Sequence, residues 1–288
     1  MSEAPHKTTA QTSAGAPRAV RMVCLDVDGT MLGASGTVRD AVWRAVETAR
    51  TAGIQIAMCS GRPGFGVTRG LSQQLDPSGW HCFQNGASIV RLADGRSQSA
   101  ALDLETVRRL IARARETDRV FELYTDDRYV TESRAEVARI HANVLGLPYD
   151  PQSYETLPPP IVRAQWIVWH HELDALLAEP HPGLEVSPSL GPALPEHVFV
   201  NLTRHGVDKG SAVRVIAAEY GVSLDEVMYV GDGLNDVPAL RIVGCPVAMG
   251  NAEPAARALA RHVVADVEAD GVAEALAMAV SSLDDEAR

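Results

Sequence analysis

The sequence predicts an α/β protein, in which a doubly wound parallel sheet is interrupted by an inserted α+β domain. Short apolar segments alternate with segments of helical periodicity at both ends of the chain, which is typical of parallel strands joined by crossover helices. This alternation stops after Gly86 and returns near residue 202, with a mixed pattern between them. The chain has 288 residues, which is enough for two compact domains.

The first half of the predicted core contains three strands. Residues 19–27 are apolar and β-branched and end abruptly at a DGT turn, so they predict a buried strand. Residues 37–53 have apolar positions at helical spacing and end at a glycine, which predicts a helix. A second strand is expected at 54–60, before an SGRPG turn and a further helix, and a third at 81–86.

The inserted segment, residues 87–201, has a different character. It predicts hairpins at 88–100 and 121–131, helices at 104–116, 134–145 and 172–178, and strands at 162–170, 184–189 and 197–202. From Asp208 the strand–helix alternation returns, with predicted helices at 208–221, 236–244, 252–260 and 271–283, and strands at 226–231, 246–250 and 262–265. The predicted core is therefore residues 19–86 together with 202–288.

Composition and charge exclude several classes of protein. The formal net charge is −11, which disfavours a protein built to coat nucleic acid or anionic lipid. Residues 1–18 are small and polar, which predicts a disordered tail without the apolar region of a signal peptide. No apolar segment approaches the ~20 residues of a membrane span. We therefore expect a cytoplasmic protein with neither nucleic acid nor a membrane as partner; whether it is a monomer or a homo-oligomer stays open.

Four polar clusters follow predicted strands or begin predicted helices: Asp26–Thr30, Ser60–Arg62, the helix start at Lys209, and Gly231–Asp236. In an open parallel sheet, ligands bind beyond the carboxyl ends of the strands. The sheet would bring these clusters to one rim. Their convergence predicts a functional site.

The acidic residues of these clusters indicate a metal site. Asp26 and Asp28 are one residue apart, and two carboxylates so close require a shared proton or a cation, although a DxDG sequence can equally form a plain surface turn. Asp232 and Asp236 add carboxylates from a glycine-rich loop. Magnesium fits these oxygen ligands better than zinc, because the motifs contain neither histidine nor cysteine.

Two further clusters have groups suited to a phosphate. Ser60 and the main-chain N–H groups of Gly61 and Arg62 precede a helix, where phosphate oxygens are readily bound. Lys209 offers a point charge at the start of another helix. Each has a structural alternative: Ser60 as a simple helix cap and Lys209 as a solvated surface lysine. Arg62 either contacts substrate or pairs with a core carboxylate.

The sequence DVDGT, then SGR, DKG and GDGLND, resembles the haloacid-dehalogenase superfamily, specifically the Cof-type phosphatases with a type IIB cap. The resemblance covers nearly all of the chain after residue 19. It implies a Rossmann-like catalytic core over 19–86 and 202–288, with residues 87–201 as an α+β cap domain. At the junction, Asn85-Gly86-Ala87 matches a sequence common in these relatives and either contacts substrate or only forms the turn.

The resemblance also implies roles for individual residues. Asp26 would be the nucleophile, and Asp28 the acid that protonates the leaving alkoxide and then deprotonates the hydrolytic water. Mg²⁺ would be held by Asp26, the main-chain carbonyl of Asp28, and Asp232, with Asp236 supporting the metal. Substrate phosphate would be bound by Ser60, Gly61, Lys209 and Asn235.

The implied activity is a magnesium-dependent phosphatase that acts on a small phosphate ester through an aspartyl-phosphate. The substrate would be a sugar phosphate, a nucleotide-related phosphate or a cofactor phosphate. A phosphomutase or other phosphotransferase is the first alternative, and a catalytically silent binding protein the second. An acid at position 28 favours phosphoryl chemistry over dehalogenation, because an alkoxide leaving group needs a proton and a halide does not.

Overall fold

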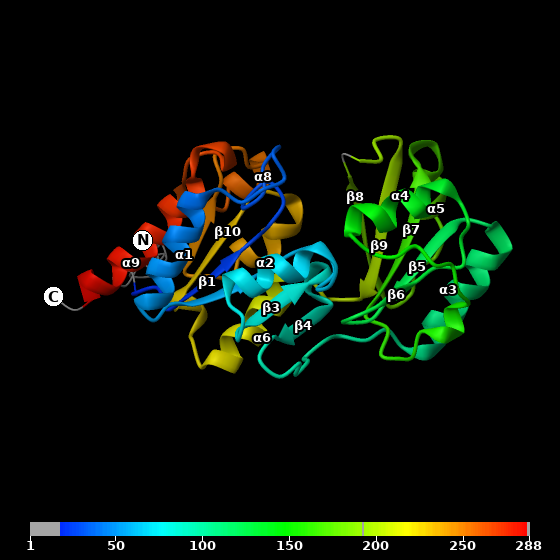
Figure 1. Cartoon of the computed structure of the whole chain (residues 1–288), viewed down its shortest axis with the longest axis horizontal. Coiled ribbons are helices and arrows are strands. Elements are labelled where there is room, and N and C mark those ends of the chain that lie inside the picture. The colour runs from blue at the N-terminus through cyan, green and yellow to red at the C-terminus, as the bar shows by residue number, and fades with distance from the viewer. Residues whose placement is uncertain (1–17, 192, 287–288) are drawn as a thin grey trace, which may run out of the picture.

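The structure is a computed structural model that describes residues 18–191 and 193–286 (Figure 1). The tail predicted at residues 1–18 lies outside the described part, apart from Arg18. Two groups of elements stand side by side along the long axis of the molecule, one around a parallel sheet and one around an antiparallel sheet (Figure 1). The predicted fold class is confirmed.

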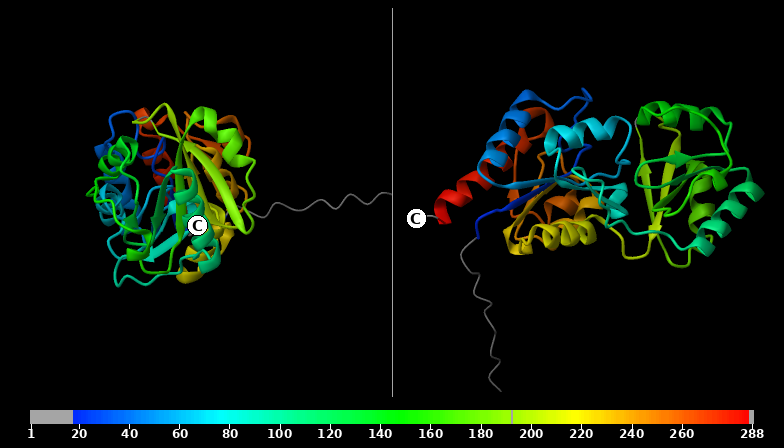
Figure 2. Two further views of the ribbon diagram at one scale, coloured as in Figure 1. Left: turned by 90° about the vertical axis from the view of Figure 1, so that its right-hand side faces the viewer. Right: turned by 60° about the horizontal axis from the view of Figure 1, so that its bottom comes forward.

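The core sheet has five parallel strands in the order β12-β11-β10-β1-β2. Its central strands are apolar and fully buried, because helices cover both faces. Helices α1 and α9 pack together on one side, and Figure 2 shows α6 on the other. The strands are β1 (Met22–Leu25), β2 (Gln55–Met58), β10 (Val227–Gly231), β11 (Cys245–Ala248) and β12 (His262–Val263); the helices are α1 (Asp40–Thr51), α2 (Val67–Leu75), α6 (Lys209–Tyr220), α7 (Val237–Leu240), α8 (Pro254–Arg257) and α9 (Gly271–Glu286).

The predicted third strand differs from expectation in its pairing. β3 (Trp80–Phe83) pairs antiparallel with β4 (Ser88–Arg91) and meets β2 through one bridge, between Cys59 and Cys82. Beside that bridge the Met58 N–H donates to Nδ1 of the buried His81 at 3.0 Å, so the imidazole takes the place of a ladder bond. Burial lowers the pKa of His81 to about 4, which keeps the ring neutral and Nδ1 able to accept.

The second sheet has five antiparallel strands in the order β6-β5-β7-β9-β8 and its own hydrophobic core. Its strands are β5 (Val120–Tyr124), β6 (Tyr129–Val130), β7 (Arg163–Trp169), β8 (Leu184–Leu190) and β9 (His197–Arg204), and its helices are α3 (Leu104–Thr117), α4 (Glu136–Leu145) and α5 (Leu173–Leu177). We call these elements the cap. The strands and helices predicted from residue 104 onward are present, whereas the hairpin predicted at 88–100 is reduced to β4 and a single bridge between Val90 and Ser97. The domain boundaries at 86/87 and 201/202 stay a prediction.

The chain leaves and re-enters the core at neighbouring points. Gly86 has φ +103°, and a Cβ there would lie 2.2 Å from the main-chain oxygen of Asp208. Only glycine allows this approach. Asp208 in turn caps α6, because its carboxylate accepts the Ser211 N–H at 2.7 Å. This capping bond from Asp208 fixes Lys209 as the first residue of α6.

None of the helices among the described residues is long and apolar enough to cross a membrane.

Candidate active site

Lys209 and Asp26 meet at the carboxyl edge of the core sheet. Asp26 directly follows β1, and Lys209 begins α6. The Lys209 ammonium is fully buried and donates to the carboxylates of Asp26 and Asp236, the latter at 2.6 Å. Burial alone would lower the pKa of Lys209, but Asp236 and Asp26 outweigh it and raise the pKa above its ordinary value. Lys209 is therefore a buried cation and not a solvated surface lysine.

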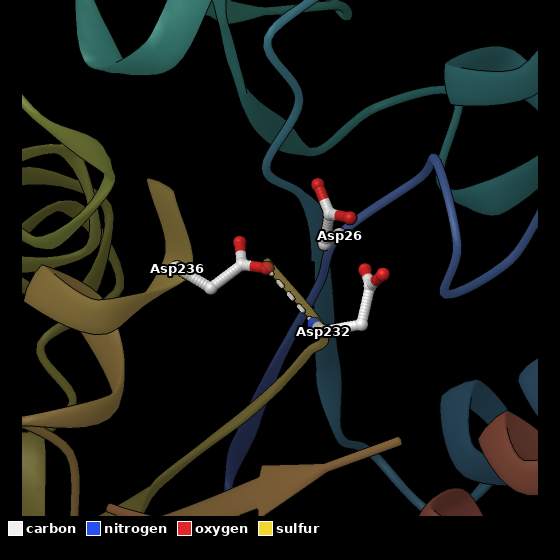
Figure 3. A group of neighbouring side chains, drawn as sticks. All are labelled: Asp26, Asp232 and Asp236. Carbon is white, nitrogen blue, oxygen red and sulfur yellow. Dashed lines mark hydrogen bonds between the residues drawn. The ribbon is translucent and has the colours of Figure 1, made fainter. Parts of the chain in front are cut away.

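Asp236 uses both of its carboxylate oxygens to hold its neighbours. Oδ1 accepts from Lys209 and from the Tyr229 hydroxyl at 2.7 Å. Oδ2 accepts the main-chain N–H groups of Asp232 and Gly233, each at 2.9 Å. Figure 3 shows the bond that joins Asp236 to Asp232. Asp236 thus fixes both the lysine and the glycine-rich loop.

Asp26, Asp232 and Asp236 each bring a carboxylate oxygen within 4.8 Å of the others (Figure 3). Burial and the charge of Asp236 raise the pKa of Asp26 well above its ordinary range, and the same two causes raise the pKa of Asp232 to about 6. Neighbouring carboxylates repel each other when both are ionised, and a bound cation stabilises their charged forms. Since Asp236 is engaged elsewhere, Asp26 and Asp232 are the two carboxylates suited to a metal ion.

The turn after Asp28 brings the first motif against Asp232. Gly29 has φ +81°, and a Cβ at this position would lie 2.1 Å from Oδ2 of Asp232. The Thr30 hydroxyl donates to Oδ1 of Asp232 at 3.0 Å. Asn251, which follows β11, donates to the Gly29 carbonyl at 2.7 Å. The Asp232 carboxylate is therefore positioned by residues from two other segments of the chain.

Asp28 forms a two-bonded ion pair with Arg62, with Nε–Oδ2 at 2.8 Å and Nη2–Oδ1 at 2.5 Å. This is one of the two roles left open for Arg62. The pair joins the first predicted motif to the second. The Asp28 side chain is about half exposed, so the pair contributes little to stability, roughly 0–1 kcal/mol. Asp28 matters for chemistry because it lines the same cavity as Asp26 and Asp232.

The other predicted site residues differ in how deeply they are buried. The Ser60 hydroxyl is fully buried and accepts the Arg62 N–H at 3.0 Å, so it stabilises the turn in which Gly61 lies. Asn235 is exposed at the rim and donates to Oδ1 of Asn85 at 3.1 Å. Asn85 lies in the junction turn with φ +55° and also lines the cavity. It therefore belongs both to the turn and to the site.

A cavity of about 700 Å³ lies between the core and the cap. From the core it is lined by Asp26, Asp28, Gly61, Arg62, Asp232 and Asn235, and from the cap by residues that include His141, Arg163, Gln165 and Phe199. Of the predicted site residues, Ser60, Lys209 and Asp236 are fully buried. The structure therefore brings together all the predicted site residues of the core domain at the carboxyl edge of the parallel sheet.

Sequence reasoning assigned no role to several residues of this site. Thr30, Tyr229 and Asn251 hold the acidic residues in place, and Arg163 reaches from the cap to the Gly61 carbonyl at 3.1 Å. Asn251 could have been found, because it follows a predicted core strand as the other site residues do. Arg163 could not have been found, because it lies within a predicted strand of the insertion, and the alternation of residues in that strand indicates only sheet packing.

Comparisons with known proteins agree with this geometry. The family model of haloacid dehalogenase-like hydrolases matches residues 23–168 and 187–276. The pyridoxal phosphate phosphatase YbhA of Escherichia coli (strain K12) is 29% identical, over 88% of this chain and 96% of that protein. A Bacillus subtilis (strain 168) phosphatase of 5-amino-6-(5-phospho-D-ribitylamino)uracil is 25% identical over 88% and 96%.

Solved structures share the fold. A haloacid dehalogenase-like hydrolase from Bacteroides thetaiotaomicron superposes with a TM-score of 0.80 at 24% identity, over 90% of this chain and 99% of that one. A subclass IIB sugar phosphatase superposes with a TM-score of 0.74 at 23% identity, over 90% and 98%. The chain belongs to the haloacid dehalogenase-like hydrolases, and it shares its fold with the subclass IIB sugar phosphatase. The predicted class of enzyme, a hydrolase of the phosphatase type, is confirmed.

Proposed function

We propose that this protein is a magnesium-dependent phosphatase that hydrolyses a small phosphorylated metabolite through an aspartyl-phosphate on Asp26. The observation that carries the proposal is the meeting of Asp26, Asp232 and the buried Lys209 at the floor of one cavity, with Asp28 above them. This set combines a nucleophile, a cation site and a fixed positive charge. Phosphoryl transfer needs these elements because its catalysis is mostly positioning and charge stabilisation.

Asp26 and Asp232, with the main-chain carbonyl of Asp28, would hold Mg²⁺, and Asp236 would support them from beneath. The fit rests on the donor set, because these ligands are oxygens and their carboxylates carry raised pKa values that a cation would reverse. When bound, the ion would neutralise charge on the phosphoryl oxygens. The other steps belong to the residues of the chain.

In the first step a carboxylate oxygen of Asp26 attacks phosphorus, and the bond to the leaving oxygen breaks. Lys209 keeps Asp26 oriented, and we assign the phosphoryl oxygens to Lys209, the Gly61 N–H and Asn235; the Ser60 assignment stays a prediction. Asp28 donates a proton to the leaving oxygen and then takes one from the water that hydrolyses the aspartyl-phosphate. The Arg62 ion pair with Asp28 must open when Asp28 is protonated.

The substrate falls among the small phosphate esters. Relatives of this chain are phosphatases of pyridoxal phosphate and of a ribitylamino-uracil phosphate, which favours a cofactor-related phosphate over the other classes. A phosphotransferase would use the same aspartyl-phosphate, with an alcohol in place of water.

Release of inorganic phosphate from an aryl phosphate, with and without Mg²⁺, tests the proposal. A second series with excess glycerol separates the two reactions, because a transferase would release the aryl alcohol faster than inorganic phosphate. Equal rates of release indicate a hydrolase. No magnesium-dependent release from any ester would refute the proposal.

A further inference from the structure

A buried carboxylate in the cap fixes two side chains that line the cavity. Glu122 on β5 is fully buried, and it bonds to Nδ1 of His141 and to Nε2 of Gln165, each at 3.0 Å. Burial would raise the pKa of Glu122, but His141 and Tyr124 outweigh it and lower the pKa, so Glu122 is ionised. A carboxylate only accepts, so Gln165 presents its N–H₂ to Glu122 and turns its carbonyl oxygen elsewhere.

That carbonyl oxygen is free to take a ligand. Gln165 lines the cavity, and its Oε1 accepts no hydrogen bond from the described residues. Its orientation is set from behind by Glu122, which is bonded on both oxygens. Gln165 is therefore a pre-positioned acceptor in the cavity wall, suited to a donor on the ligand.

Arg163 supplies the complementary donor. Its guanidinium lies 4.0 Å over the Tyr124 ring, and Nη1 donates to the Gly61 carbonyl and to Oδ1 of Asn201, both at 3.1 Å. Its Nε is fully buried, so a ligand cannot reach it, but Nη2 bonds to no acceptor within residues 18–191 and 193–286 and is not fully buried. Arg163 lines the same cavity as Gln165, so an acceptor on the ligand would satisfy Nη2.

The cap wall around these two groups is largely apolar. Leu145, Leu194 and Phe199 line it, and the Phe199 ring lies 4.8 Å from the His141 ring. A hexose would place several hydroxyls against these side chains without partners, which is unfavourable. A flat ring with apolar faces and a polar edge matches both parts of the wall.

We propose that the substrate is the phosphate ester of a planar heteroaromatic alcohol, whose ring packs against Phe199 and Leu194 and whose polar edge bonds to Gln165 and Arg163. The inference rests on the proposed phosphatase activity and narrows its substrate class. Glu122 acts as a positioning residue behind Gln165.

The first test uses the unmodified protein with Mg²⁺ and three esters: pyridoxal 5′-phosphate as the ring probe, glucose 6-phosphate as the polyhydroxyl probe, and glycerol 2-phosphate as a small acyclic reference. We expect kcat/KM for the ring probe to exceed that for glucose 6-phosphate at least about tenfold. A preference for glucose 6-phosphate would overturn the inference and leave the phosphatase proposal intact. No release from any of the three would refute the phosphatase proposal as well.

The second test compares Gln165→Leu and Arg163→Lys with a matched control, Gln152→Leu. Gln152 lies in the cap outside the cavity, and its amide bonds to Asp150. The ratio of kcat/KM for the ring probe to that for glycerol 2-phosphate should fall about tenfold in each cavity variant and stay constant in the control. Circular dichroism checks folding, and Arg163→Lys keeps the charge and the aliphatic stem if Gln165→Leu does not fold. An unchanged ratio in a folded cavity variant would overturn the assignment of that residue.

Discussion

Replacing Gly29 by alanine should disable the site without unfolding the protein. The new Cβ would lie 2.1 Å from Oδ2 of Asp232, whereas ordinary contact begins at 3.4 Å, so the carboxylate must move by about 1.3 Å. A displacement of about 1 Å costs on the order of 100-fold in rate. The backbone at φ +81° adds strain of roughly 1–2 kcal/mol, which is small enough for the fold to survive.

Gly36→Ala is the matched control for this variant. Gly36 has φ +68°, so alanine suffers comparable backbone strain, but no atom lies within 4 Å of its Cβ. Both variants should lose similar stability in urea unfolding. Only Gly29→Ala should lose about 100-fold in kcat/KM for phosphate release and need more magnesium for half-maximal rate. Equal activity losses in the two variants would refute the steric reasoning, because strain alone would then explain the effect.

Four further predictions follow from the same geometry. Asp26→Asn should retain less than about a tenth of the wild-type rate in a folded protein; a higher rate means under ~1.4 kcal/mol of barrier, too little for a nucleophile. Asp232→Ala should raise the magnesium needed for half-maximal release at least about tenfold, and full wild-type activity in excess chelator would contradict the metal proposal. Burial lowers the pKa of His81 to about 4 in the folded protein, so the stabilisation that the neutral ring provides is complete above pH 6.5. The free energy of unfolding should fall by up to about 3 kcal/mol as the pH is lowered toward 4. His81→Asn should remove this pH dependence in urea titrations, and equal pH dependence in variant and wild type would show that His81 is not its cause. Joining Ala100 to Gly206 by a short linker should leave a folded core that still hydrolyses a small aryl phosphate but no longer discriminates among substrates; an unfolded product, with no protease-sensitive sites near 86–90 or 200–206, would argue for one continuous domain.

The sequence was informative where periodicity and local chemistry coincide. The apolar segments before Asp26 and Asp232 could become central strands only if both faces were covered, and the polar residues after them then had to share one rim. That reasoning located the acidic residues and Lys209. It could not show that the carboxylate oxygens of Asp236 bond to Tyr229 and to the loop, because those bonds depend on the packing of α7, which follows Asp236, against β10.

Two results lay beyond sequence reasoning for a physical reason. The pairing of β3 depends on His81, whose imidazole replaces a ladder bond, and a period of two residues does not distinguish such a strand from a regular member of the sheet. The cap wall depends on Glu122, Arg163 and Gln165, which are polar residues at buried strand positions. Alternation within the strand assigns such positions to packing, and only the assembled sheet reveals their shared contacts.

The neighbouring crossing points of Gly86 and Asp208 have a consequence for how such a protein can diverge. Ala87, Ala100 and Val207 pack in one small cluster, so the cap begins and ends at nearly the same place. An insertion with adjacent ends leaves the path of the host chain unchanged, and its length adds only slowly to the entropy of closure. Caps of other sizes and sequences can therefore be exchanged at this point while the strand order β12-β11-β10-β1-β2 and its acidic rim are preserved. The recognition proposed for the cap and the chemistry proposed for the core can then change separately during evolution.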